Sequence, residues 1–197
     1  MARFPSVTKV KGMYGRWLPS DTRSGYHGLM LIRNESGADH ALIAELNRRA
    51  FGGDLESELI DRLRAEKLVL ASLVAVDAYD HILGHILFSR ARVQTNKGEV
   101  PVASLGPMCV DPQVQRHGIG SALVRHGIRA CRRLDESATI VVGNPNFYAE
   151  NGFSHDVVKH LQSPYAGEAF MGMELVPGSL TQLSGEVMYP AAFAVFA

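Results

Sequence analysis

The segment between residues 100 and 142 constrains the fold most strongly, because strand and helix patterns follow one another there in a fixed order. Residues 100–110 are mostly apolar and strand-like. After Asp111-Pro112, a helix is predicted from about residue 120 to residue 134, and residues 138–142 then form the continuous apolar run of a buried strand. Two buried strands separated by one helix predict a parallel pair joined by a crossover helix.

The flanking segments predict a mixed sheet covered by helices. Strands are expected at residues 29–32, 68–76, 82–88, 157–160 and 170–175, and helices at residues 39–51, 54–66 and 146–150. The three successive strands between residues 68 and 110 predict an antiparallel meander. The predicted fold class is therefore α/β, with a mixed, mainly antiparallel sheet flanked by helices.

Composition bounds the classes of protein that this chain can belong to. Its 197 residues fit one core, and 46% hydrophobic against 20% charged residues indicate a globular domain. The 20 basic and 20 acidic residues balance, which disfavours a polybasic nucleic-acid binder. No stretch approaches the roughly 18 consecutive apolar residues of a membrane span. Cys109 and Cys131 are too few for a disulfide framework, so a cytoplasmic location is expected.

The chain divides into three parts by pattern. Residues 1–27 contain several basic residues and no apolar stretch of export-signal length, so a loosely packed leader is expected. Residues 28–176 carry the strand and helix patterns of the domain. Residues 177–197 are expected to form a C-terminal extension that packs on the same domain. The oligomeric state stays open, with a homodimer among the options.

A loop bounded by two glycines leads from the strand at residues 100–110 into the next helix. Its sequence is Gln115-Arg116-His117-Gly118-Ile119-Gly120-Ser121. Such a helix start exposes backbone N–H groups, and the helix dipole adds favourable potential for an anion. Leu123 stands where a dinucleotide fingerprint requires a small residue, and the Lys of a Walker A loop is missing. The loop predicts a phosphate site of another kind.

The predicted helix after this loop is basic. Arg116, Arg125, Arg129, Arg132 and Arg133 fall between Pro112 and Leu134, a span that contains no acidic residue. This pattern fits an anionic partner or an ordinary solvated helix face. A nucleic-acid partner is not expected, because no aromatic stacking pattern accompanies the arginines and the net charge is zero.

Two sequence blocks together carry a family resemblance. The first is Gln115-Arg116-His117-Gly118-Ile119-Gly120, preceded by Val110-x-Pro112, and the second is Asn144-Pro145-Asn146-Phe147-Tyr148-Ala149-Glu150-Asn151-Gly152-Phe153. The first resembles motif A of the GNAT superfamily of N-acetyltransferases. The second resembles the family's next motif, in which a short helix carries a tyrosine and ends in Gly-Phe. The similarity in element order covers about residues 29–175 and implies the acyl-CoA N-acyltransferase fold.

The resemblance implies acetyl-CoA as co-substrate, an amine as acceptor and no metal. The residues implied to contact the cofactor are Met108, Val110, Gln115, Arg116, His117, Gly118, Ile119, Gly120, Ser121, Asn144 and Tyr148. In that scheme the loop holds the pyrophosphate and the main chain of Met108 and Val110 pairs with the pantetheine arm. Pro107 removes a hydrogen-bond donor where the family's strand bulges.

The resemblance also implies two catalytic groups. The Met108 backbone N–H would stabilise the oxyanion, and Tyr148 would protonate the leaving thiolate as general acid. Some family members carry a glutamate at the place of Ser104, which cannot act as a base at neutral pH. The general base is therefore open, and a water chain is one route for the proton.

Several alternatives accompany this interpretation. A nucleophilic Cys109 is conceivable, although direct attack by the amine is favoured. His81 and His85 have a metal-like spacing but no third ligand. The acidic helix at residues 54–66 either lines the acceptor cleft or is a solvated face. Other functions left open are transfer of another acyl group, transfer to a hydroxyl, and an acyl-CoA-binding regulatory module without turnover.

Overall fold

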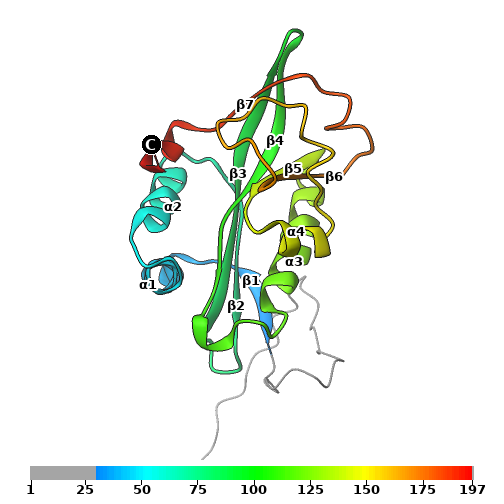
Figure 1. Cartoon of the computed structure of the whole chain (residues 1–197). Helices are drawn as coiled ribbons and strands as arrows, with labels where there is room; N and C mark the ends of the chain where they lie inside the picture. Colours follow the sequence, from blue (N-terminus) through cyan, green and yellow to red (C-terminus); the bar gives the residue numbers. More distant parts are fainter. Residues whose placement is uncertain (1–29, 197) are drawn as a thin grey trace, which may run out of the picture.

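The computed structural model describes residues 30–196, and these form one twisted sheet with helices on both faces (Figure 1). The strands are β1 (Leu31–Asn34), β2 (Val69–Val76), β3 (Ile82–Thr95), β4 (Gly98–Val110), β5 (Ala138–Val142), β6 (Phe170–Glu174) and β7 (Gly185–Met188). Strands β1 to β6 lie side by side in sequence order, and β7 pairs with the C-terminal residues of β3, Arg92 to Thr95. Only β4 and β5 are parallel among these pairs.

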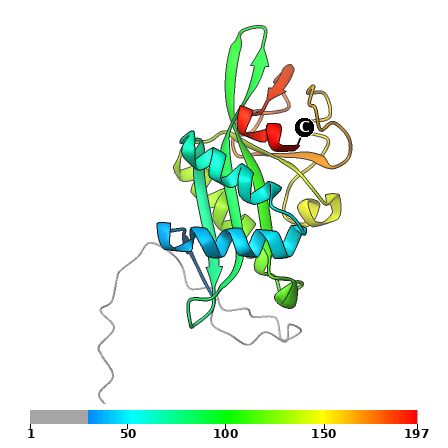
Figure 2. The same ribbon diagram turned by 90° about the vertical axis from the view of Figure 1, so that its left-hand side faces the viewer.

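The helices divide between the two faces of the sheet. They are α1 (His40–Phe51), α2 (Leu55–Ala65), α3 (Ile119–Arg133) and α4 (Pro145–Glu150), with short 3-10 segments η1 (Gly37–Asp39), η2 (Pro112–Val114) and η3 (Ala191–Phe196). Helices α1 and α2 cover one face, and α3 and α4 lie on the other (Figure 2). Segment η3 packs against α2. The sheet therefore separates two layers of helices.

Successive side chains of β3 point to opposite faces of the sheet, so they alternate between two hydrophobic cores. Ile86 and Phe88 pack under α3 with Leu123, whereas Leu87 packs under α1 and α2. Gly127 allows α3 to approach closely, because a Cβ atom there would lie 2.1 Å from Cε2 of Phe88. This contact fixes the distance of α3 from the sheet and so the position of its N-terminus.

The structure confirms the mixed, mainly antiparallel sheet, the meander of β2, β3 and β4, and the parallel β4–β5 pair joined by α3. Strand β3 is longer than the predicted 82–88. The predicted strand at residues 157–160 is wrong, because this segment forms turns in which the N–H groups of Val158 and Lys159 donate to the carbonyl of His155. Strand β7 was not predicted. The predicted leader at residues 1–27 lies outside the described residues.

Within residues 30–196, none of the helices combines the length and the apolar character needed to cross a membrane.

Candidate active site

Strands β4 and β5 separate after a short stretch of pairing. They pair only at Ala103 to Leu105, although β4 continues to Val110. On the other side of β4, Leu105 pairs with Phe88 and Met108 pairs with Ile86. Two residues of β4, Gly106 and Pro107, therefore lie opposite one residue of β3, which is a β-bulge. The bulge occurs at Pro107, as the sequence predicted, and it coincides with the parting of the two strands.

The main-chain groups of Met108 and Val110 face the edge of β4 that β5 has left. The Asp111 N–H donates to the carbonyl of Leu83, next to β3, at 2.9 Å. Main-chain groups of successive strand residues point to opposite edges, so Cys109 also faces β3. Met108 and Val110 then face the open edge. This edge can accept hydrogen bonds from, and donate them to, an extended ligand.

The loop before α3 presents uncapped amides at the end of this edge. Arg116 (φ 63°) and Gly118 (φ 78°) adopt left-handed backbone conformations that turn the chain into the helix. Gly118 is the N-cap and offers no side chain to the amides of the first turn, which include those of Gly120 and Ser121. The macrodipole of the 15-residue helix α3 adds positive potential at this point.

Side chains around the loop hold it in place. Asp111 accepts a hydrogen bond from the Gln113 N–H at 3.0 Å and pairs with Arg49 of α1 at 3.0 Å. The Gln115 Nε2 donates to the carbonyl of Val110 at 3.2 Å. His117 Nδ1 lies 2.7 Å from the carbonyl oxygen of Gln115. These contacts tie the loop to α1 and to the end of β4.

The corner between β5 and α4 positions Tyr148. Asn144 caps α4, and its Oδ1 accepts hydrogen bonds from the N–H groups of Asn146 and Phe147. The Tyr148 side chain is buried between Phe147 and Phe153, with ring centroids 5.0 and 5.5 Å away in edge-to-face geometry. This burial raises the pKa of Tyr148 well above its ordinary value. The phenol therefore keeps its proton at neutral and moderately alkaline pH.

Gly143 makes room for the Tyr148 ring. A Cβ atom at Gly143 would lie 2.4 Å from Cε2 of Tyr148, closer than real contacts allow. The ring orientation thus depends on a residue without a side chain at the end of β5.

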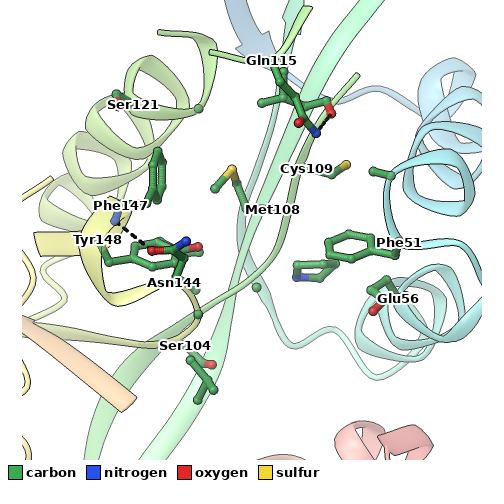
Figure 3. Close-up of a pocket in the computed structure, with 18 of the residues that line it drawn as sticks. Phe51, Glu56, Ser104, Met108, Cys109, Gln115, Ser121, Asn144, Phe147 and Tyr148 are labelled. Carbon is green, nitrogen blue, oxygen red and sulfur yellow. Dashed lines mark hydrogen bonds between the residues drawn. The ribbon is translucent and has the colours of Figure 1, made fainter. Parts of the chain in front are cut away.

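One cavity of about 920 Å³ connects these features. The residues predicted to contact the cofactor that line it are Met108, Val110, Gln115, Arg116, Gly118, Ile119, Gly120, Ser121, Asn144 and Tyr148, whereas His117 is not among the lining residues. Asn144, Phe147 and Tyr148 lie on one side of β4 and Phe51 and Glu56 on the other (Figure 3). The cavity therefore passes around the open edge of β4 and reaches both layers.

The side of the cavity next to α1 and α2 contains groups that motif-based analysis missed. Glu56 of α2 lines it, together with four aromatic side chains from the C-terminal part of the chain, Tyr165, Tyr189, Phe193 and Phe196. The acidic pattern of residues 54–66 hinted at Glu56, but it did not distinguish Glu56 from its solvent-facing neighbours. No local pattern marked the aromatic residues, because the fold alone brings them to this side.

Two residues considered from the sequence also lie here. Ser104 is buried in β4 and lines the cavity. Cys109 is buried in β4, and burial raises the pKa of its thiol to about 12. A thiol with so high a pKa is a poor nucleophile at neutral pH.

The histidines with metal-like spacing do not converge. His81 is exposed and contacts Asp77, whereas His85 is fully buried and contacts Ser72. Among the described residues, no three His, Cys, Asp or Glu side chains are grouped to hold a metal ion.

Comparison with known proteins places this architecture in a family. The model of the acetyltransferase (GNAT) family matches residues 40–153. YhbS of Escherichia coli K12, an uncharacterized N-acetyltransferase, is 29% identical over 169 residues, which cover 85% of this chain and 100% of YhbS. YjhQ of the same organism, also an uncharacterized N-acetyltransferase, is 33% identical over 132 residues, covering 65% of this chain and 70% of YjhQ.

Two similar crystal structures contain a ligand. The YhbS complex with CoA has a TM-score of 0.80 and 27% identity, and covers 89% of this chain and 97% of that chain. A GNAT family acetyltransferase from Brucella melitensis in complex with acetyl-CoA has a TM-score of 0.71 and 31% identity, and covers 85% of this chain and 99% of that chain.

Proposed function

Because the chain belongs to the GNAT family of acetyltransferases, we propose that it transfers the acetyl group of acetyl-CoA to a primary amine by direct attack. The observation that carries this proposal is the cavity that joins the uncapped start of α3, the open edge of β4 and Tyr148. The ligands of the two similar structures, CoA and acetyl-CoA, support the choice of cofactor.

The site fits acetyl-CoA in charge and shape. The uncapped amides at residues 118–121 suit the pyrophosphate. Gly120 leaves these backbone amides accessible. Even a Cβ atom at this position would crowd Phe147, since it would lie 3.3 Å from Cζ of that residue. The open edge of Met108 and Val110 suits the two amides of the pantetheine arm, which would pair like an added strand. When bound, acetyl-CoA supplies the activated acetyl thioester.

Met108 and Tyr148 are proposed to act on opposite ends of the bond that breaks. The Met108 N–H stabilises the negative charge that develops on the carbonyl oxygen. The amine nitrogen forms the new C–N bond while the C–S bond breaks. Tyr148 gives its proton to the leaving sulfur, and the proton lost by the amine passes through water in the cavity and restores the phenol.

The surroundings of Cys109 and Tyr148 support direct transfer over a covalent enzyme intermediate. The raised pKa of Cys109 keeps this residue a neutral thiol near pH 7. The raised pKa of Tyr148 keeps its phenol protonated, as a general acid requires.

The proposal is tested with the full chain, acetyl-CoA and a mixture of primary amines. Calorimetry should detect acetyl-CoA binding, and release of the CoA thiol should depend on the amine. Binding of acetyl-CoA without amine-dependent thiol release would instead support an acyl-CoA-binding module without turnover. Faster thiol release with propionyl-CoA than with acetyl-CoA would identify another acyl group as the one transferred. Thiol release that depends on alcohols would identify a hydroxyl as the acceptor.

A further inference from the structure

We infer that the acceptor is an apolar or aromatic primary amine with a single positive charge, held at its ammonium group by Glu56. This inference rests on the proposed function for the reaction, but it concerns the other half of the cavity. The acceptor side is here defined as the part of the cavity lined by Phe51 of α1, Glu56 of α2, Phe193 and Phe196 of η3, and the tyrosines whose rings adjoin Phe193, which are Tyr189 and, next to it, Tyr165.

Aromatic rings dominate the acceptor side. The Tyr189 ring contacts the Tyr165 ring edge-to-face, with centroids 5.2 Å apart, and the tilted Phe193 ring, with centroids 5.1 Å apart. Phe51 and Phe196 are 46% and 42% exposed although both line the cavity. Large apolar rings left open to solvent in a cavity are typical of a site for an apolar ligand. The body of the acceptor is therefore expected to be apolar.

Glu56 supplies the charge on the acceptor side. It is the one charged side chain among the described residues that line this side, since Arg116 and Glu150 lie next to α3 and α4. Its side chain is half-buried, and within residues 30–196 it forms neither a hydrogen bond nor an ion pair. Its neighbour Glu58, by contrast, pairs with Arg62 on the solvent side of α2. A half-buried carboxylate without a partner favours a cationic ligand.

Glu56 lines the cavity on the side of β4 opposite Tyr148 (Figure 3). Its charge acts on the thiol of Cys109, which lies between Met108 and Val110 in β4. Once the bound ammonium has lost one proton to water in the cavity, the free amine can attack from that side of β4.

A single carboxylate among aromatic rings also disfavours other amines. A diamine would bring a second ammonium among apolar rings, where a charge without a partner is costly to bury. A neutral alcohol of the same shape would contact the aromatic rings equally well, but it would leave the Glu56 carboxylate without a cationic partner. The acceptor side thus favours one charge on an apolar body.

The test compares three probes with the full chain: 2-phenylethylamine, putrescine and 2-phenylethanol. We expect kcat/KM for acetylation of 2-phenylethylamine to exceed that of putrescine by about tenfold or more. Glu56→Gln should lower kcat/KM for 2-phenylethylamine by about 10- to 100-fold, mainly through KM, because a hydrogen bond to a charged group is lost. Inhibition by 2-phenylethanol should not weaken, which a merely structural role of Glu56 would not explain.

Matched control variants distinguish the loss of the Glu56 charge from a general effect on the fold. Glu58→Gln removes an exposed carboxylate from the same helix and should change kcat/KM by no more than about twofold. Phe196→Ala should raise KM for 2-phenylethylamine, whereas Tyr79→Ala, which removes a ring that is 82% exposed on the β2–β3 turn, should not.

The outcomes distinguish this inference from the proposed function. Preference for putrescine, or equal effects of Glu56→Gln and Glu58→Gln, would overturn the inference while the acetyl transfer stands. Binding of 2-phenylethylamine that depends on Glu56, measured by calorimetry, without any acetyl transfer would overturn the proposed function and leave the inference standing.

Discussion

Tyr148 packs its ring in the core and is proposed to donate a proton, and one substitution separates these two roles. Tyr148→Phe keeps the ring contacts with Phe147 and Phe153 and removes the hydroxyl proton. We expect the single-turnover rate of CoA release to fall by about 10²- to 10⁴-fold, the usual contribution of a general acid. The affinity for acetyl-CoA, measured by calorimetry, should stay close to that of the parent. An unchanged single-turnover rate would mean that Tyr148 only packs.

The raised pKa of Tyr148 leads to a prediction about alkaline pH. Burial disfavours the charged phenolate, so the folded-state pKa lies above the ordinary value of about 10. Ionisation of this group then begins only above that value. We expect kcat of the parent to show no descending limb below about pH 10. A descending limb near pH 8 would show that another group donates the proton.

Gly143 provides an independent test of the position of the same ring. Gly143→Ala would place a Cβ atom 2.4 Å from the present site of Cε2 of Tyr148, so the ring must move. We expect kcat to fall by about tenfold or more, because small displacements of a catalytic group are costly. Gly37→Ala is the control, since nothing lies within 4 Å of its added Cβ atom. Equal kcat values for both variants would contradict the assigned position of Tyr148.

Among the elements, helix α3 is expected to control the affinity for the cofactor through its first turn. Gly120→Val would place a branched side chain over the uncapped amides and against Phe147. We expect the affinity for acetyl-CoA to fall by about tenfold or more, because the pyrophosphate could no longer approach the backbone. Calorimetry measures the affinity, and thermal unfolding shows whether the variant is folded. A folded variant with parental affinity would place the pyrophosphate elsewhere.

The limits of prediction from sequence are visible in individual elements. The helices and the β4–α3–β5 unit were predicted because their apolar periodicity and glycines are local signals. Residues 157–160 misled because two adjacent valines favour a strand, but Val158 instead buries its side chain from a turn. Strand β7 has four residues and one buried side chain, Val187, which is too little alternation to detect.

Sequence motifs predicted the part of the candidate site that lies in contiguous segments. Residues 115–121 and Tyr148 lie in contiguous blocks, and the structure places most of them around one cavity. Glu56, Tyr189 and Phe196 come from separate segments that meet only through the packing of η3 against α2. Such a meeting of distant segments leaves no signal in any one stretch of sequence.

At the scale of the whole molecule, ion pairs at one end of the sheet predict how stability depends on pH. Glu35 accepts hydrogen bonds from Arg64 and Ser72, and the His85 ring lies 3.6 Å away; burial acts to raise its pKa, but these contacts outweigh it and hold the pKa below its ordinary value. Asp39 pairs with both terminal nitrogens of Arg33, at 2.7 and 2.9 Å, which lowers its pKa as well.

A carboxylate with a lowered folded-state pKa stabilises the fold above its unfolded pKa, which is near 4. This contribution is lost as the pH falls from that value towards the folded pKa. Burial lowers the pKa of His85, so this group reduces stability as the pH falls below its unfolded pKa near 6.5. We therefore expect the free energy of unfolding to decrease gradually from about pH 7 and more steeply below about pH 4.5. Urea denaturation across this range measures it. An increase in stability on acidification would contradict these assignments.

Asp39 and Asp80 allow the contribution of one ion pair to be isolated, because both contact Arg33. Asp39→Asn should reduce the free energy of unfolding at neutral pH by about 1–3 kcal/mol, since Asp39 is buried and hydrogen-bonded. Asp80→Asn should cost about 0–1 kcal/mol, because the Asp80 side chain is 72% exposed. Similar losses for both variants would contradict the larger role of Asp39.

The separation of β4 from β5 predicts a distinctive pattern of amide hydrogen exchange rates along β4. Strand amides that are hydrogen-bonded in a sheet exchange slowly, and exposed ones exchange fast. Cys109 faces β3 and should exchange slowly, whereas its neighbours Met108 and Val110 face the open edge and should exchange fast. Acetyl-CoA should slow Met108 and Val110 and leave Cys109 unchanged. Deuterium uptake at three consecutive residues would thus reveal whether the cofactor takes the place of the missing strand.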